Sequence, residues 1–169
     1  MPRFQYHQPS YRTSQSILSL PSVLTDSHLA VIRAYAAIPE DPTLRQEQGQ
    51  AILDILNTAH ALPACTLVVA DRRQVHRRSG ARLVQKTYGY YRGIFQNGDF
   101  QRGTIRIYHR TAVREQPIAP NVFLTTLFHE WVHHYDYTGL HILRSYHTSG
   151  FYSRIRSLTE EILPVTSSQ

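Results

Sequence analysis

The 169-residue chain contains only one cysteine, Cys65. A single thiol excludes an intramolecular disulfide and any zinc finger of paired cysteines, so a metal site has to be built from histidine and carboxylate. Cys65 follows Pro63-Ala64 and precedes an apolar segment, which favours a buried structural thiol over a nucleophile. The ten histidines are therefore the main source of candidate ligands.

Long apolar runs are also lacking, because nothing in the chain approaches the roughly 18 consecutive apolar residues of a transmembrane helix. The first 25 residues contain Arg3, Arg12 and no acid, which faintly resembles an organelle transit peptide. Residues 17–24 are interrupted by serine and proline and make a poor secretory signal. A cytoplasmic compartment is the expectation, with organelle targeting by the N-terminus as the alternative.

Acidic residues are scarce: 12 Asp and Glu face 18 Lys and Arg, which gives a net charge of +6 and a pI near 9.7. Such a balance favours acidic partners, nucleic acid among them, because Lys and Arg neutralise phosphates and release counterions. An ordinary basic surface is the alternative. With 41% hydrophobic residues, the chain is long enough to fold as one domain without disulfide or metal staples.

The expected architecture is α+β. Residues 1–24 read as a polar arm that is either flexible or draped over the domain and that receives no secondary structure, and residues 25–169 read as the folded domain. Capping residues, prolines and hydrophobic periodicity predict helices over 26–38, 43–60, 121–137 and 150–163. Alternation and β-branched content predict strands over 66–70, 80–95 and 104–108, the last two joined by a turn at 97–98.

The most informative motif is His129-Glu130-Trp131-Val132-His133. From this composition, chance would produce roughly 0.02 HExxH matches. Residues four apart on a helix are neighbours on one face, so His129 and His133 can present nitrogens to one zinc ion, with Glu130 beside it.

A turn of about 100° per residue separates this helix into two faces. The predicted metal face carries His129, Glu130, His133, Asp136 and Tyr137. The predicted core face carries Leu124, Phe128, Trp131, Val132 and Tyr135. His134 falls between the faces, and packing or a solvent-exposed position is favoured for it over metal binding.

The third ligand has to come from beyond Gly139. The metzincin spacing would require Gly and His three and six residues after His133, and those positions hold Asp136 and Gly139. The remaining candidates are His141, His147 and the pair Glu160 and Glu161, of which the glutamates would give a gluzincin-like site.

The segment from Leu127 to His134, followed by His147-Thr148-Ser149-Gly150-Phe151, resembles the SprT-like metallopeptidases. The resemblance implies that His147 is the third ligand and that one Zn²⁺ is bound per chain. It also implies a zincin-like domain with N-terminal helices, a small sheet of three or four strands, the HExxH helix and a C-terminal helix. The chain has Thr-Ser-Gly-Phe after the histidine, where a Gly-Pro-Glu-Phe type of run is usual in that family, and it lacks a cysteine-rich zinc ribbon.

These residues predict a zinc metalloendopeptidase in which Glu130 takes a proton from the attacking water. Asp136 is expected to accept the second ring N–H of a ligating histidine, and Tyr137 and Tyr152 are candidates to stabilise the oxyanion. In related folds an edge strand pairs with the extended substrate, and residues 104–108 are the candidate for that strand.

Basic side chains are concentrated before and around three tyrosines, a combination suited to single-stranded nucleic acid. They are Arg72, Arg73, Arg77, Arg78, Arg82 and Lys86. The alternative is a solvated hairpin. The expected substrates are therefore proteins or peptides, including proteins associated with nucleic acid. The competing function is a non-catalytic nucleic-acid-binding protein with a structural zinc site.

Overall fold

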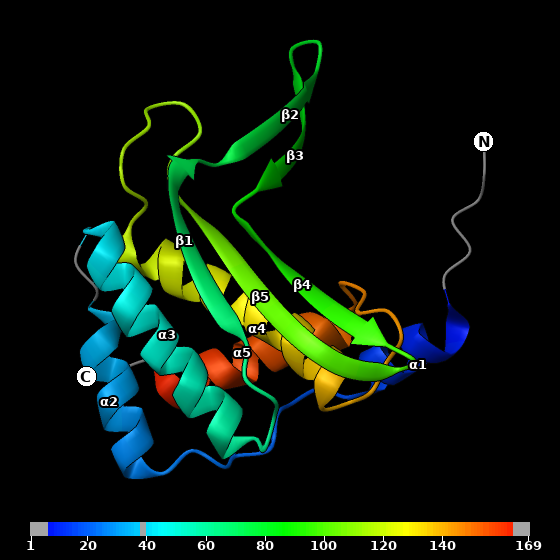
Figure 1. Ribbon diagram of the computed structural model, residues 1–169. Coiled ribbons are helices and arrows are strands. Elements are labelled where there is room, and N and C mark those ends of the chain that lie inside the picture. Colours follow the sequence, from blue (N-terminus) through cyan, green and yellow to red (C-terminus); the bar gives the residue numbers. More distant parts are fainter. Residues whose placement is uncertain (1–6, 38–39, 164–169) are drawn as a thin grey trace, which may run out of the picture.

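The computed structural model describes residues 7–37 and 40–163, shown in Figure 1. Within them the chain forms five helices and five strands. The helices are α1 (Gln8–Ser16), α2 (Asp26–Ala36), α3 (Pro42–Ala59), α4 (Pro120–Thr138) and α5 (Ser149–Ile162). The strands are β1 (Thr66–Arg73), β2 (Val75–Ser79), β3 (Arg82–Thr87), β4 (Gly89–Gln96) and β5 (Asp99–Arg110). The α+β class predicted from the sequence is confirmed.

The main sheet has three strands in the order β1-β5-β4. β5 pairs in parallel with β1 and antiparallel with β4, and the turn between β4 and β5 contains Asn97 and Gly98 as predicted. β2 and β3 form a separate antiparallel hairpin that projects from one end of the sheet (Figure 1).

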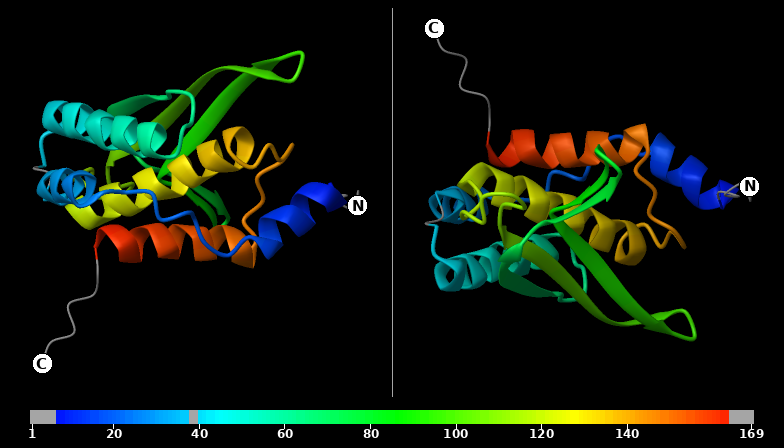
Figure 2. Two further views of the ribbon diagram at one scale, coloured as in Figure 1. Left: turned by 90° about the horizontal axis from the view of Figure 1, so that it is seen from below. Right: turned by 90° about the horizontal axis from the view of Figure 1, so that it is seen from above.

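α4 lies between the sheet and α5, and α3 lies beside β1 (Figure 2). The predicted core face of α4 is confirmed: its five residues are all buried, with Phe128, Trp131 and Val132 fully so. They pack into one apolar cluster with the inner residues of the sheet, such as Ile105 and Ile107, and with α3. Each such side chain contributes about 1.5–3 kcal/mol by leaving water, and together they fix the position of the motif helix.

The helices begin where the sequence supplies caps. Asp41 accepts a hydrogen bond from the N–H of Leu44 at the start of α3, and Thr148 accepts one from Phe151 at the start of α5. The predicted cap Asn121 is wrong by two residues, because Ala119 occupies the N-cap and Pro120 the first turn of α4. Proline suits that position since its missing N–H would have no partner there.

The predicted strand 80–95 is two strands that belong to different sheets. β3 ends at Thr87 and β4 begins at Gly89, with Tyr88 between them. Gly89 lies so close to β5 that a Cβ would be 2.6 Å from the carbonyl oxygen of Arg106. A glycine inside a strand pattern often marks such a close approach.

The prediction that 104–108 is an edge strand is wrong. Thr104 to Tyr108 of β5 pair with Thr66 to Ala70 of β1 on one side and with β4 on the other. The parallel pairing of β1 and β5 needs a crossover, and β2, β3 and β4 occupy that connection. β4 is therefore the edge strand nearest to α4.

The segment before residue 25 contains the helix α1, which the sequence did not predict. His7 caps it, and α1 packs against α5. Among the described residues, no helix is long and apolar enough to cross a membrane.

Candidate metal centre and cleft

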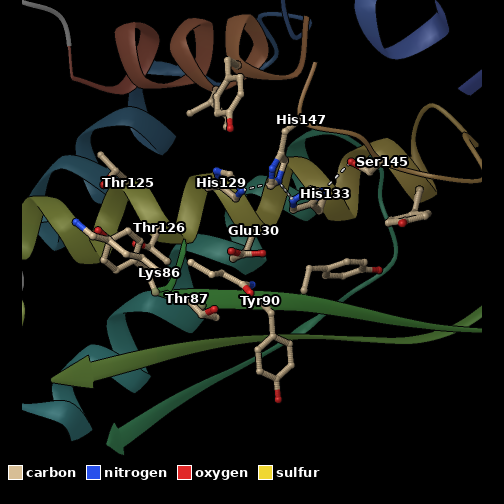
Figure 3. Close-up of a pocket in the computed structure, with 17 residues that line it drawn as sticks. Lys86, Thr87, Tyr90, Thr125, Thr126, His129, Glu130, His133, Ser145 and His147 are labelled. Atoms are coloured by element: carbon tan, nitrogen blue, oxygen red, sulfur yellow. Dashed lines mark hydrogen bonds between the residues drawn. The ribbon is translucent and has the colours of Figure 1, made fainter. Parts of the chain in front are cut away.

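Three histidines converge at one point. His129 and His133 lie one turn apart on α4, and His147 lies in the loop between α4 and α5 (Figure 3). The Nε2 atom of His147 is 3.1 Å from that of His129 and 3.0 Å from that of His133. Within the described part of the chain, these three form the group of side chains that could hold a metal ion.

The other candidates for the third ligand lie elsewhere. His141 is exposed in the loop after α4 and lines a separate apolar pocket with Pro63 and Ile142. Glu160 is exposed, and Glu161 accepts a hydrogen bond from the Ser22 hydroxyl near the far end of α5. The structure thus brings His147, and neither glutamate, to the motif.

His134 is buried, so packing, and not a solvent-exposed position, describes it. Its ring nitrogens contact the Tyr91 hydroxyl at 3.1 Å and the Pro63 carbonyl oxygen at 2.8 Å. It therefore fastens α4 to β4 and to the loop before β1.

Asp136 supports the centre through an intermediate residue. Its carboxylate accepts a 2.7 Å hydrogen bond from Ser145 Oγ, which lies 2.7 Å from His133 Nδ1. Because the serine proton is used on Asp136, His133 donates its Nδ1–H to the serine and keeps a lone pair on Nε2. The predicted direct contact between Asp136 and a ligating histidine is replaced by this relay.

The donor set fits a zinc ion. Four-coordinate zinc with Zn–N bonds of about 2.0–2.1 Å places its ligand nitrogens about 3.3 Å apart, close to the spacings of these imidazoles. Without a cation the three nitrogens cannot all be satisfied, since His133 Nε2 carries a lone pair and His147 Nε2 has at most one proton to share.

Burial keeps these imidazoles neutral. It lowers the pKa of His129 to about 4, with a further contribution from His147. The pKa of His133 is lowered well below its ordinary value, again by burial first, and that of His147 is lowered by burial. Neutral imidazole is the form that binds metal, so all three are prepared for coordination near pH 7.

Glu130 lies beside the histidines and is 7% exposed. Burial raises the pKa of its carboxyl to about 7, while a backbone hydrogen bond with Tyr91 of β4 acts in the opposite direction. A carboxyl with a pKa near neutrality can both accept and return a proton at physiological pH.

Phe151 of α5 forms the wall behind the histidines. Its ring centroid lies 5.0 Å from that of His129, 4.5 Å from that of His133 and 5.0 Å from that of His147. This ring is fully buried and packs beside all three imidazoles.

An open cleft of about 810 Å³ surrounds the centre. Its floor is α4, one wall is β4 with the end of β3, and the opposite wall comes from the His147 loop and α5 (Figure 3). Lys86 and Thr87, at the end of β3, extend the β4 wall toward the β2–β3 hairpin.

Both candidate tyrosines line the cleft. The Tyr137 ring stacks on that of Tyr91 with centroids 5.8 Å apart. The Tyr152 ring lies 5.8 Å from that of His147 and is about half exposed. Tyr137 therefore packs against its neighbours, whereas Tyr152 is the more exposed of the two.

The predicted basic residues are all exposed and follow the end of β1 into the β2–β3 hairpin. Arg73 forms a 3.3 Å ion pair with Glu115. Lys86 is the member that also lines the cleft. Cys65 is buried, and burial raises the pKa of its thiol to about 11, which agrees with a structural thiol.

Sequence reasoning missed Ser145 and Arg154, and it considered Tyr91 only as one of the three tyrosines beside the basic residues. Arg154 is fully buried and donates a 2.9 Å hydrogen bond to Asp136, and Tyr91 contacts both Glu130 and His134. The sequence offered only the position of Ser145, two residues before His147, as a signal.

Comparison of the chain with protein-family models, curated proteins and solved structures finds no significant match.

Proposed function

We propose that the protein is a zinc-dependent endopeptidase with its active site in the cleft. The observation that carries the proposal is the convergence of three neutral imidazoles beside a buried carboxyl with a raised pKa. A structural zinc site is closed by four protein ligands, whereas a catalytic site has three and keeps one position open. Three ligands at the bottom of an open cleft favour catalysis.

The edge of β4 supplies a place for an extended substrate. The Tyr108 N–H donates to the Tyr88 carbonyl. Because backbone groups alternate along a strand, those of Tyr88 and Tyr90 point toward β5, and those of Gly89 and Tyr91 point away from it. Among the described residues no strand pairs with this side of β4. A peptide added there would lie over Glu130 and the histidines.

His129, His133 and His147 would hold the zinc ion, which supplies a Lewis acid for the peptide carbonyl and the attacking water. Glu130 accepts the proton of that water as the new C–O bond forms, and it returns the proton to the amine nitrogen as the C–N bond breaks. Tyr137 and Tyr152 are the candidates to stabilise the negative charge on the carbonyl oxygen.

Two further features support a relationship to the SprT-like metallopeptidases and a zincin-like fold. The first is the resemblance of the segments around His133 and His147 to that family. The second is the layout, in which the motif helix lies beneath a small mixed sheet whose free edge borders the cleft.

The basic hairpin favours substrates near nucleic acid. Its exposed cations lead into the cleft at Lys86, so a protein attached to DNA or RNA could be cleaved while the nucleic acid contacts the hairpin. The same hairpin is the basis of the second candidate, a nucleic-acid-binding protein in which zinc is structural.

The test combines metal content with cleavage of an unfolded protein. We expect one zinc per chain, loss of cleavage on chelation and recovery on adding Zn²⁺. His147→Ala should lose both metal and cleavage. His141→Ala, an exposed histidine in the same loop, is the matched control and should keep both. Zinc binding without cleavage of any unfolded protein would favour the structural-zinc candidate, and a wild type without zinc would contradict both.

A further inference from the structure

The N-terminal helix is docked by polar contacts. The buried residues of α1 are Ser10 and Ser14, so the helix adds little to the apolar core. A docking surface of this kind contributes mainly to position, because hydrogen bonds have strict geometry and modest net stabilisation.

These contacts are directed at the loop that carries Ser145 and His147. The backbone N–H of His7 donates to the Tyr146 hydroxyl at 2.8 Å, and Ser10 Oγ accepts from the Arg144 N–H at 3.3 Å. The hydroxyls of Ser14 and Thr148 are hydrogen bonded at 2.9 Å. Residues on both sides of His147 are therefore held by α1, as the position of the orange loop beside the blue helix in Figure 2 shows.

A second route leads from α1 to His133. Arg154 donates to the carbonyl oxygens of Ser14 and Ile17 at 2.7 and 2.6 Å, to Ser14 Oγ at 3.1 Å and to Asp136 at 2.9 Å. Asp136 in turn holds Ser145 on His133. The end of α1 thus holds the Arg154 guanidinium in place. Arg154 in turn holds Asp136, which bonds Ser145 beside His133.

The fit between α1 and α5 is close. A Cβ on Gly150 would lie 2.1 Å from the Ser14 carbonyl oxygen and 2.7 Å from that of Gln15. Any larger side chain at residue 150 would have to displace the end of α1, although alanine itself suits a helix.

We propose that α1 is a positioning element of the metal centre, which holds the 140–148 loop so that His147 completes the ligand set that α4 begins. His129 and His133 are placed by a packed helix, whereas His147 lies in a loop, and loops are mobile unless they are tied down. A metal site needs its ligands within about 0.5 Å of the productive geometry. The assignment rests on the proposed metal site and is independent of peptide cleavage.

The variants are Gly150→Ala, which pushes α1 away, and the double variant Ser10→Ala/Ser14→Ala, which removes the two buried hydroxyls. Ser16→Ala, an exposed serine of the same helix, is the control. In metal-free protein, amide hydrogen exchange over residues 140–148 should be at least about tenfold faster in both variants, while exchange around His129 and His133 stays unchanged.

Zinc affinity, measured by competition with a chromophoric chelator, should fall about 10–100-fold in the same variants. With Co²⁺ as the probe, the visible spectrum should lose the intensity of a tetrahedral three-histidine site, a change that a general loss of stability would not produce. Ser16→Ala should match the wild type in each measurement.

Unchanged exchange of the loop in a folded variant would overturn the proposal, as would faster exchange with zinc affinity within twofold of the wild type. If Gly150→Ala does not fold, the serine double variant decides. A wild type that binds no zinc contradicts the proposed function. The exchange experiment still tests whether α1 holds the 140–148 loop in place.

Discussion

The two edges of the main sheet carry the same kinds of backbone groups but differ in what covers them. The outer edge of β1 is closed by α3: Gln46 bonds the Leu67 carbonyl and the Val69 N–H, both at 2.8 Å. One turn later, Gln50 bonds the Leu67 N–H at 2.7 Å and the Cys65 carbonyl at 3.0 Å. Each side-chain amide replaces a piece of neighbouring strand.

Within the described residues no strand pairs with the outer edge of β4, which borders the cleft and where Tyr91 forms a backbone hydrogen bond with the Glu130 carboxyl. An open edge is an aggregation hazard that proteins usually block. The difference agrees with the proposal that one edge serves stability and the other binds an extended substrate. Changes at β1 should therefore lower the free energy of unfolding without affecting the proposed zinc site, and changes on the β4 side should affect the proposed site without lowering the free energy of unfolding.

The largest expected effect on stability is at the closed edge. Gln46→Ala and Gln50→Ala should each lower the free energy of unfolding by about 1–3 kcal/mol, because each removes the side-chain partner of two backbone groups in β1 or in Cys65, the residue before it. Denaturant titration measures the loss, and zinc content should not change. Glu47→Ala, on the exposed side of α3, is the control. A loss no larger than that of the control would show that the glutamines do not close the edge.

On the cleft side, Glu130→Gln should stabilise the metal-free protein at high pH. The pKa of Glu130 in the fold is about 7, above its value of about 4.3 in an unfolded chain. The stabilisation of the fold that goes with the protonated carboxyl is therefore complete below the unfolded-state pKa. It is lost as the pH rises through about 7. Glutamine does not titrate, so the variant should gain about 1–3 kcal/mol at pH 8, and the gain should shrink as the pH falls toward 4.5.

Urea titrations of metal-free protein at pH 8 and pH 5 make this measurement. Glu160→Gln removes an exposed acid on α5 and should show no such pH-dependent gain. An equal gain at both pH values would mean that the carboxyl is not buried as described.

The open edge can be probed from the substrate. In a peptide with one known cleavage site, methylating single backbone nitrogens should lower kcat/KM about 2–10-fold at alternate positions, since each lost hydrogen bond is worth about 0.5–1.5 kcal/mol. The intervening nitrogens point away from β4 and act as internal controls. Losses without a two-residue period would exclude strand addition.

The smallest effect concerns the basic hairpin. If the hairpin binds single-stranded nucleic acid, affinity should fall steeply with salt, and Arg77→Gln/Arg78→Gln should flatten that slope by about one for each lost phosphate contact. Arg156→Gln on α5, also exposed, is the control. Equal slopes for both variants would leave the hairpin as a solvated surface.

Local signals predicted much of the fold. Caps, prolines and periodicity located α2, α3, α4 and α5 to within a few residues, because these features act over one or two helical turns. The strand order could not be obtained this way, since pairing of β1 with β5 joins segments far apart in the sequence. Gly89 inside a strand pattern was a signal for the break between β3 and β4, and Gln46 and Gln50, four residues apart, were a signal for a polar helix face.

In the site, helical geometry alone placed His129, Glu130 and His133 on one face. His147 came from the resemblance, with His141, Glu160 and Glu161 left open by spacing, and only the fold brings its Nε2 to the other two. The contact predicted for Asp136 was wrong, because a loop residue, Ser145, lies between the His133 imidazole and the Asp136 carboxylate. The proposed role of α1 could not be predicted from the sequence, because its contacts are to residues more than 130 positions away.

The most direct test of the central claim is cleavage of one unfolded protein by zinc-loaded wild type and zinc-loaded Glu130→Gln, with new chain termini identified by mass spectrometry. Glutamine keeps the size of the side chain but cannot accept the proton of water, so the variant should fold and should hold as much zinc as the wild type. Cleavage should fall about 10²–10⁴-fold, the usual contribution of a general base. Equal rates of cleavage, or no new termini from either protein while both hold zinc, would contradict the account.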